Sequence, residues 1–131
     1  MNQAAMQDFA RLLLRVTLGV LVLLHGIAKL RHGLDGVESL LQMRGWPTFL
    51  AYGALVGEVL APLMLIAGFH ARIGGVLVAV NMLFALLLAH LGELGRLNGQ
   101  GGWALELQAM FLVAAVAVAL LGPGRFSINQ R

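Results

Sequence analysis

The residues of this chain that could carry chemistry are a few ionisable and aromatic side chains within or beside long apolar runs. They form a candidate polar cluster of seven: Arg15, His25, Lys29, Glu58, His90, Trp103 and Glu106. If the apolar runs cross a bilayer, a charged side chain at the centre costs about 2.5–3.5 kcal/mol on insertion scales. Each charged member therefore needs a partner, a water-filled cavity or a function, such as binding a polar ligand or relaying protons.

Glu58 is the acid that lies deepest in an apolar run. Unpaired, a carboxylate at that depth would take up a proton, whereas a basic group on another helix would keep it charged. Arg15, His25 and Lys29 are candidates because they share one helix face. At about 100° per residue, Lys29 lies about 40° and His25 about 80° from Arg15, on the same side. The sequence thus predicts that this face turns inward, toward Glu58 and Glu106.

Ordinary structural roles compete with these functions. Lys29 and Arg15 can extend toward lipid head groups, and Trp103 can anchor a helix at the membrane interface. His90, at the end of its apolar run, can be a surface histidine rather than a ligand. Such an alternative is weakest for Glu58, because nothing at its depth offers water.

The residue types present limit the cofactor and metal chemistry of the chain. There is no cysteine, so a redox role would need a cofactor, such as a quinone, or a partner protein. Haem or a metal ion held by His25 and His90 is disfavoured, because neither helix has a second ligand three or four residues away. No metal site is therefore predicted, and no sequence motif assigns a catalytic residue.

The composition shows which elements must position these groups. Of the 131 residues, 60% are hydrophobic and 11% are charged, against about 25% charged in ordinary globular domains. One domain of this length, residues 1–131, has too little interior to hide so much apolar surface, so lipid is the expected solvent. The net charge of +3 is not gathered in a basic stripe, which argues against a nucleic-acid partner.

Four apolar runs are each close to the ~20 residues that cross a bilayer as a helix. The predicted fold is all-α: an integral membrane four-helix bundle, with spans at about residues 9–30, 49–69, 73–91 and 103–121. Between the first two spans, apolar residues recur at helical spacing among polar ones, which predicts a short amphipathic helix on the membrane surface. Its apolar face would comprise Leu34, Val37, Leu40, Leu41 and Met43.

Two further patterns concern the second span and the orientation of the chain. Gly53 and Gly57 form a small-residue pair that lets another helix approach, and Pro62 is expected to kink the same helix. Five of the nine Lys and Arg residues lie on the side of the two termini, a bias that favours cytoplasmic termini. Glu58 then lies midway in the membrane, and the outer half holds His25, Lys29, His90, Trp103 and Glu106.

Several segments together resemble the DoxX family of membrane proteins. They cover nearly the whole chain and are LRVTLG from Leu14, LHGIAKL from Leu24, VGEVLAP from Val56, GGWALE from Gly101 and GPGRFS from Gly122. The Asn-rich turn that precedes the tryptophan in many relatives is reduced here to Asn98 and Gln100. The family's motif positions correspond in this chain to Arg15, His25, Gly26, Lys29, Glu58, Trp103, Glu106 and Arg125.

The resemblance implies a multi-pass, four-helix protein of the bacterial cytoplasmic (inner) membrane with a link to redox metabolism. The family takes its name from a subunit associated with a terminal quinol oxidase, and some members are linked to thiol and oxidative-stress systems. Whether this chain is itself an oxidoreductase subunit is not decided by its sequence.

The sequence therefore supports three hypotheses about function. In the first, a redox-linked protein binds a quinone or other small lipophilic molecule at the polar cluster in the outer half of the bundle. In the second, a non-catalytic accessory subunit docks a membrane redox or oxidative-stress complex. The third, a small-solute or proton transporter, is weakened by the lack of an internal repeat. The expected partners are the lipid bilayer and either a second copy of the chain or a larger membrane complex.

Overall fold

The computed structural model describes residues 2–87 and 106–129, and within these ranges every regular element is a helix. The longest helix, α1, spans Gln3–His32, and the short α2 spans Asp35–Met43. α5 spans Ala71–Ala85 and α6 spans Glu106–Leu121. Between α2 and α5 runs a continuous helical segment made of the 3₁₀ turn η1 (Thr48–Leu50), α3 (Ala51–Leu55), the π-turn η2 (Val56–Leu60) and α4 (Ala61–Ala67).

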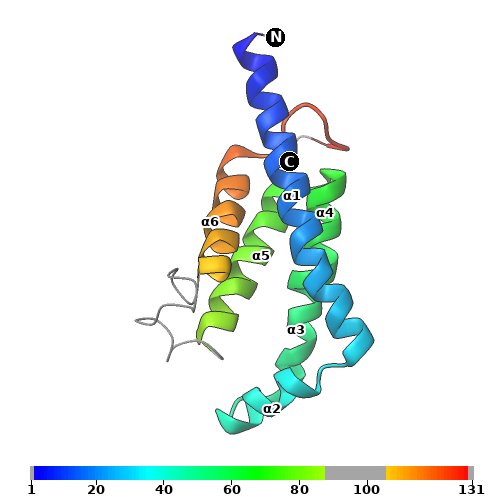
Figure 1. Ribbon diagram of the computed structural model, residues 1–131, viewed down its shortest axis with the longest axis vertical. Helices are drawn as coiled ribbons and strands as arrows, with labels where there is room; N and C mark the ends of the chain where they lie inside the picture. The colour runs from blue at the N-terminus through cyan, green and yellow to red at the C-terminus, as the bar shows by residue number, and fades with distance from the viewer. Residues whose placement is uncertain (1, 88–105, 130–131) are drawn as a thin grey trace.

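Four helical segments lie side by side along the long axis, and α2 crosses one end (Figure 1). The four are α1, the α3–α4 segment, α5 and α6. α5 packs most extensively against α6, and α1 packs against α4, α6 and η2. The shared core lies between these helices and includes the buried side chains of Val22, Leu65, Val78 and Val118. The described part of the chain thus forms an all-α bundle with an additional short helix.

Within the described ranges, two helical segments are long and apolar enough to cross a membrane: Gln3–His32 and Thr48–Ala67. The predicted third and fourth spans correspond to shorter apolar helices, and the rest of these spans, residues 88–91 and 103–105, lies outside the described ranges. Large apolar side chains cover the outer faces, and at least half exposed are Leu24, Leu63, Val80 and Val113. Such a surface is unfavourable in water and suits lipid.

Local sequence explains where these helices begin and end. α1 begins earlier than predicted because Asn2 caps it: the Asn2 side chain accepts a hydrogen bond from the backbone N–H of Ala5 at 2.8 Å. α4 ends at Gly68, whose φ of 73° suits glycine and closes the helix. His70 follows with a φ of 47°, and its N–H donates to the side chain of Asn129 at 3.0 Å. The C-terminal segment therefore braces the tight α4–α5 hairpin.

α2 confirms the predicted amphipathic helix, with one exception. Leu41 is fully buried, and packed around it are Leu34, Val37 and Leu40. Met43 is 81% exposed, so its assignment to the apolar face was wrong. At about 100° per residue, Met43 lies about 180° from Leu34, on the opposite side of the helix. The position of α2 on the membrane surface stays a prediction.

The second predicted span departs from a regular α-helix just before Pro62. In η2 the backbone hydrogen bonds reach back five residues instead of four, so the turn is wider than in an α-helix. Gly57, within this turn, lets α5 approach closely: a Cβ on Gly57 would lie 2.4 Å from the Cβ of Asn81. Gly53 faces open space. The predicted close approach is therefore confirmed at Gly57 and wrong at Gly53, and the irregularity expected at Pro62 is a π-turn.

Candidate functional site

Glu58 lies at the centre of η2, where the backbone is already irregular. Pro62 has no N–H, so the α-helical hydrogen bond to the Glu58 carbonyl cannot form. That carbonyl instead meets α1 at Gly26, where a Cβ would stand only 1.9 Å from the Glu58 oxygen. Lys29 is three residues further along α1 and so lies on the same face as Gly26. The glycine contact therefore brings Lys29 to the Glu58 side chain.

Lys29 and Glu58 form an ion pair across this contact, in which Nζ of Lys29 donates to Oε2 of Glu58. The Glu58 side chain is 7% exposed and the Lys29 side chain 28%. Each charge offsets the cost of placing the other in apolar surroundings. Removing one partner of a buried pair typically destabilises a protein by about 3–5 kcal/mol, because it leaves the other charge uncompensated. Of the three basic residues that the sequence offered as partners for Glu58, the structure pairs Lys29 with it.

His25 lies one turn before Lys29 on α1. Its ring contacts the ring of Phe111 on α6 edge to face, with centroids 5.6 Å apart and 62° between the ring planes. Over the described residues no hydrogen bond to His25 is found. Neither ring nitrogen is engaged by the described residues, and an imidazole nitrogen can bind a ligand or exchange a proton.

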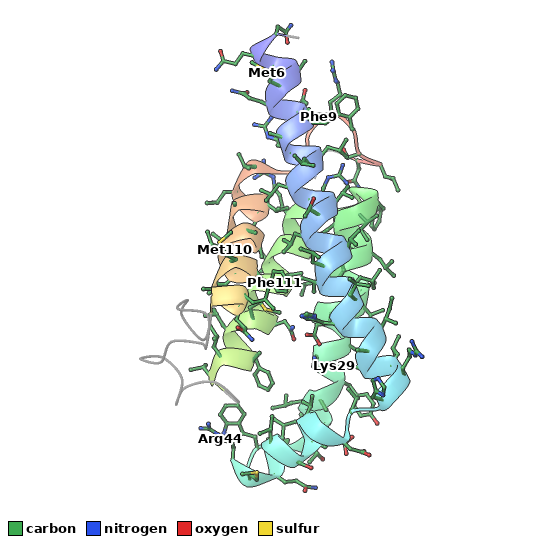
Figure 2. The ribbon with its side chains drawn as sticks, in the orientation of Figure 1. Met6, Phe9, Lys29, Arg44, Met110 and Phe111 are labelled. Carbon is green, nitrogen blue, oxygen red and sulfur yellow. The ribbon has the colours of Figure 1, made fainter. Side chains whose placement is uncertain are left out.

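A cavity of about 210 Å³ lies where α1, η2, α5 and α6 meet. It is lined by His25, Lys29, Glu58, Met82, Ala85, Leu107, Gln108 and Phe111. Figure 2 shows Lys29 on α1 and Phe111 on α6 directed into the space between these helices, while Met110 lies on the outer side of α6. The cavity therefore combines a mostly apolar wall with a buried ion pair and a histidine, the arrangement expected of a small-molecule site.

Gln108 and Phe111 are site residues that the sequence-based cluster did not include. Gln108 lies within the fourth apolar run, and its Oε1 atom is buried without a hydrogen-bond partner. A polar side chain inside an apolar run needs a partner, and this rule pointed to Glu58. The same rule could have identified Gln108. No such signal exists for Phe111, because a phenylalanine in an apolar helix has the same pattern whether it faces a cavity, the core or lipid.

Arg15 does not reach the cavity, so the prediction that it joins His25 and Lys29 in one cluster was wrong. It is fully buried, and Nη1 donates to the carbonyls of Leu65 at 2.8 Å and Ile66 at 3.1 Å. Nη2 donates to the carbonyl of Phe126. The face angles placed Arg15 near Lys29 around the helix, but at 1.5 Å per residue the two lie about 21 Å apart along it.

The role of Arg15 follows from the end of α4. The last carbonyls of a helix have no backbone partner, and a cation near them also interacts favourably with the helix dipole. Arg15 supplies both the donors and the charge, and its bond to Phe126 ties down the C-terminal segment. This arginine is therefore part of the packing between α1, α4 and the C-terminal segment.

The remaining members of the predicted cluster cannot be placed. His90 and Trp103 lie outside the described residues, as does the side chain of Glu106 at the start of α6. Their membership of the site stays a prediction. Within the part of the chain that the structure describes, no three His, Asp or Glu side chains gather closely enough to hold a metal ion.

Comparison with known proteins identifies the family of the chain. A sequence model of the DoxX family matches residues 10–91, a range that contains His25, Lys29 and Glu58. A protein of Bacillus subtilis (strain 168) named "Putative oxidoreductase CatD" is 28% identical over 115 residues, which is 88% of this chain and 81% of that protein. No solved structure gives a significant match. Because the family match covers more than half of the chain, this protein is a member of the DoxX family of membrane proteins.

Proposed function

We propose that this protein binds the ring of a quinone, or of a similar small lipophilic redox molecule, in the cavity between α1, η2, α5 and α6. The observation that carries the proposal is the Lys29–Glu58 ion pair on the wall of a cavity that is otherwise mostly apolar. Ionisable groups within membrane helices are costly and typically mark ligand or proton pathways. The same proposal places the protein in the bacterial inner membrane and the cavity in the outer half of that membrane.

The size and lining of the cavity suit a single substituted ring. A dry cavity of about 150 Å³ lined by apolar side chains can hold benzene, so the space of about 210 Å³ admits a ring with small substituents. Phe111 and Met82 offer an aromatic and a thioether surface to the faces of such a ring. A long isoprenoid tail would extend from the cavity into the lipid.

The polar groups suit a ring that carries oxygen atoms. The Lys29 ammonium has three donor hydrogens, and the ion pair with Glu58 engages one of them, so others remain for a ring carbonyl. His25 can donate to or accept from the same ligand. Lys29, Glu58 and His25 together can hold and exchange a proton beside the ring, as a quinone requires when its oxidation state changes.

The comparison with known proteins supports a redox-linked role without naming a substrate. The Bacillus subtilis relative is named as an oxidoreductase. This chain has no cysteine, so its own side chains offer no thiol redox centre. The electrons for any reaction would have to come from a bound redox group or from another protein.

The proposal is tested by ligand binding to the purified protein in lipid nanodiscs. Decylubiquinone is the probe, and its binding is measured by equilibrium dialysis and by calorimetry. We expect saturable binding in the wild type and at least tenfold weaker binding in the Lys29→Met/Glu58→Gln variant. The double variant is chosen because it removes both charges together and so leaves no unpaired buried ion. A matched control is Val113→Ala, a change on the lipid-exposed side of α6.

Two results would count against this function. Wild-type protein that binds no decylubiquinone at concentrations below its solubility limit would refute it. Equal affinity in the double variant and the wild type, with both folded, would show that any bound quinone occupies another place. An intact helical spectrum and a thermal midpoint near that of Val113→Ala would establish that the double variant is folded.

An accessory role in a larger redox complex is the second candidate. It is favoured by the absence of cysteine, which leaves electron transfer to a partner. Crosslinking in native membranes, followed by mass spectrometry, would detect such a partner. Recovery of only self-crosslinked chains would argue against this role.

A further inference from the structure

We propose that Gln108 makes the cavity selective for a ligand that carries a hydrogen-bond donor, so that it prefers the reduced, hydroxyl-bearing form of a quinone to the oxidised form. This inference rests on the proposed function. Its starting point is the Oε1 atom of Gln108, which is buried on the cavity wall and has no hydrogen-bond partner. Buried polar atoms in native proteins are nearly always paired, so an unpaired acceptor beside an empty space indicates a missing donor.

The other polar groups on the cavity wall do not supply that donor. Lys29 directs Nζ to Oε2 of Glu58. His25 contacts Phe111 and has no hydrogen bond to any described residue. None of these groups is bonded to Oε1 of Gln108, and we assign its donor to the molecule that occupies the cavity.

The two kinds of polar group lie on different helices. Lys29 and His25 extend from α1, whereas Gln108 extends from α6, one turn before Phe111 on the same face. A ring with an oxygen at each end can then accept from Lys29 at one end and donate to Gln108 at the other. A quinone has only acceptor oxygens and would leave Oε1 of Gln108 unpaired, whereas a quinol hydroxyl can donate to this atom.

The proposal predicts a preference that can be measured directly. Wild-type protein in nanodiscs is dialysed anaerobically against decylubiquinone and against its reduced form, decylubiquinol, and the two dissociation constants are compared. We expect decylubiquinol to bind about tenfold more tightly, a ratio that corresponds to about 1.4 kcal/mol. For a two-electron couple, the same ratio raises the midpoint potential of the bound ligand by about 30 mV, which a redox titration would detect independently.

The variant Gln108→Met tests the residue. Methionine has nearly the length of glutamine but cannot accept a strong hydrogen bond, so we expect the two forms to bind with similar affinity. Val113→Ala, an exposed position on the same helix, is the matched control and should keep the wild-type ratio.

The outcomes separate this inference from the function on which it rests. Equal binding of both forms by the wild type, or an unchanged ratio in Gln108→Met, overturns the inference and leaves quinone binding intact. Binding of neither form overturns both proposals. If Gln108→Met does not fold, the wild-type ratio and the redox titration still decide the question.

Discussion

Replacing Gly26 with alanine should separate α1 from η2 and disturb the candidate site without removing any of its polar groups. The added Cβ would stand 1.9 Å from the Glu58 carbonyl oxygen and 2.6 Å from its carbon. Ordinary contacts of this kind lie at 3.4 Å or more, so the two helices must move apart locally by more than an ångström. The obstacle is backbone, not the end of a flexible side chain, and it cannot rotate away.

The expected loss can be estimated from two opposing effects. Overpacking a close contact typically destabilises a protein by about 1–3 kcal/mol, and a backbone clash belongs at the upper end of this range. Alanine also improves helix propensity over glycine by about 1 kcal/mol. We therefore expect Gly26→Ala to lower the free energy of unfolding by about 1–2 kcal/mol. Because Lys29 is on the face that must move, binding of decylubiquinone should weaken as well.

Gly53→Ala is the matched control within the second span. An added Cβ there meets open space, so only the gain in helix propensity remains and stability should be equal to the wild type or greater. Both variants would be unfolded by denaturant titration in mixed micelles, followed by circular dichroism. If Gly26→Ala is as stable as Gly53→Ala and binds ligand normally, α1 does not contact the Glu58 backbone at this position and the reasoning fails.

Two further predictions concern the far end of the bundle. Arg15→Met removes three hydrogen bonds to carbonyls and should lower the free energy of unfolding by about 2–4 kcal/mol, while ligand affinity of the folded protein stays unchanged because the cavity is remote. Denaturant titration would measure the loss of stability, and dialysis would measure the affinity for decylubiquinone. An affinity loss as large as that of the Lys29→Met/Glu58→Gln variant would contradict the prediction. Asp8→Asn removes the ion pairs of Asp8 with Arg11 and Arg125, which lie near the surface, and should lower stability by about 1 kcal/mol or less. Thermal unfolding and limited proteolysis of the C-terminal segment would test this expectation.

Several parts of the structure could be predicted because they depend on the cost of burial alone. An apolar run of about twenty residues needs lipid or a core, and a helix satisfies its own backbone there. α2 was predictable for a related reason, since its apolar residues recur at helical spacing. The same cost argument showed that Glu58 must either take up a proton or pair with a basic group.

The choice of partner for Glu58 was not predictable from one helix taken alone. Arg15, His25 and Lys29 share a helix face, but face angles do not say which of them lies at the height of Glu58 on a neighbouring helix. The structure decides this through the contact of Gly26 with the η2 backbone, which selects Lys29. Arg15 instead donates to the carbonyls of Leu65 and Ile66 in the last turn of α4.

The helices, their apolar surroundings and the cost of an unpaired charge at Glu58 thus follow from the sequence alone, because each depends on the transfer of a residue from water to a nonpolar medium. Which charges meet, and that Gln108 faces a cavity with its acceptor unpaired, became evident only from the packing of the helices. These outcomes depend on the heights and rotations of whole helices, which are set by close contacts such as Gly26 against η2 and Gly57 against Asn81. The position of a residue in the sequence does not say how far that residue lies from such a contact between helices.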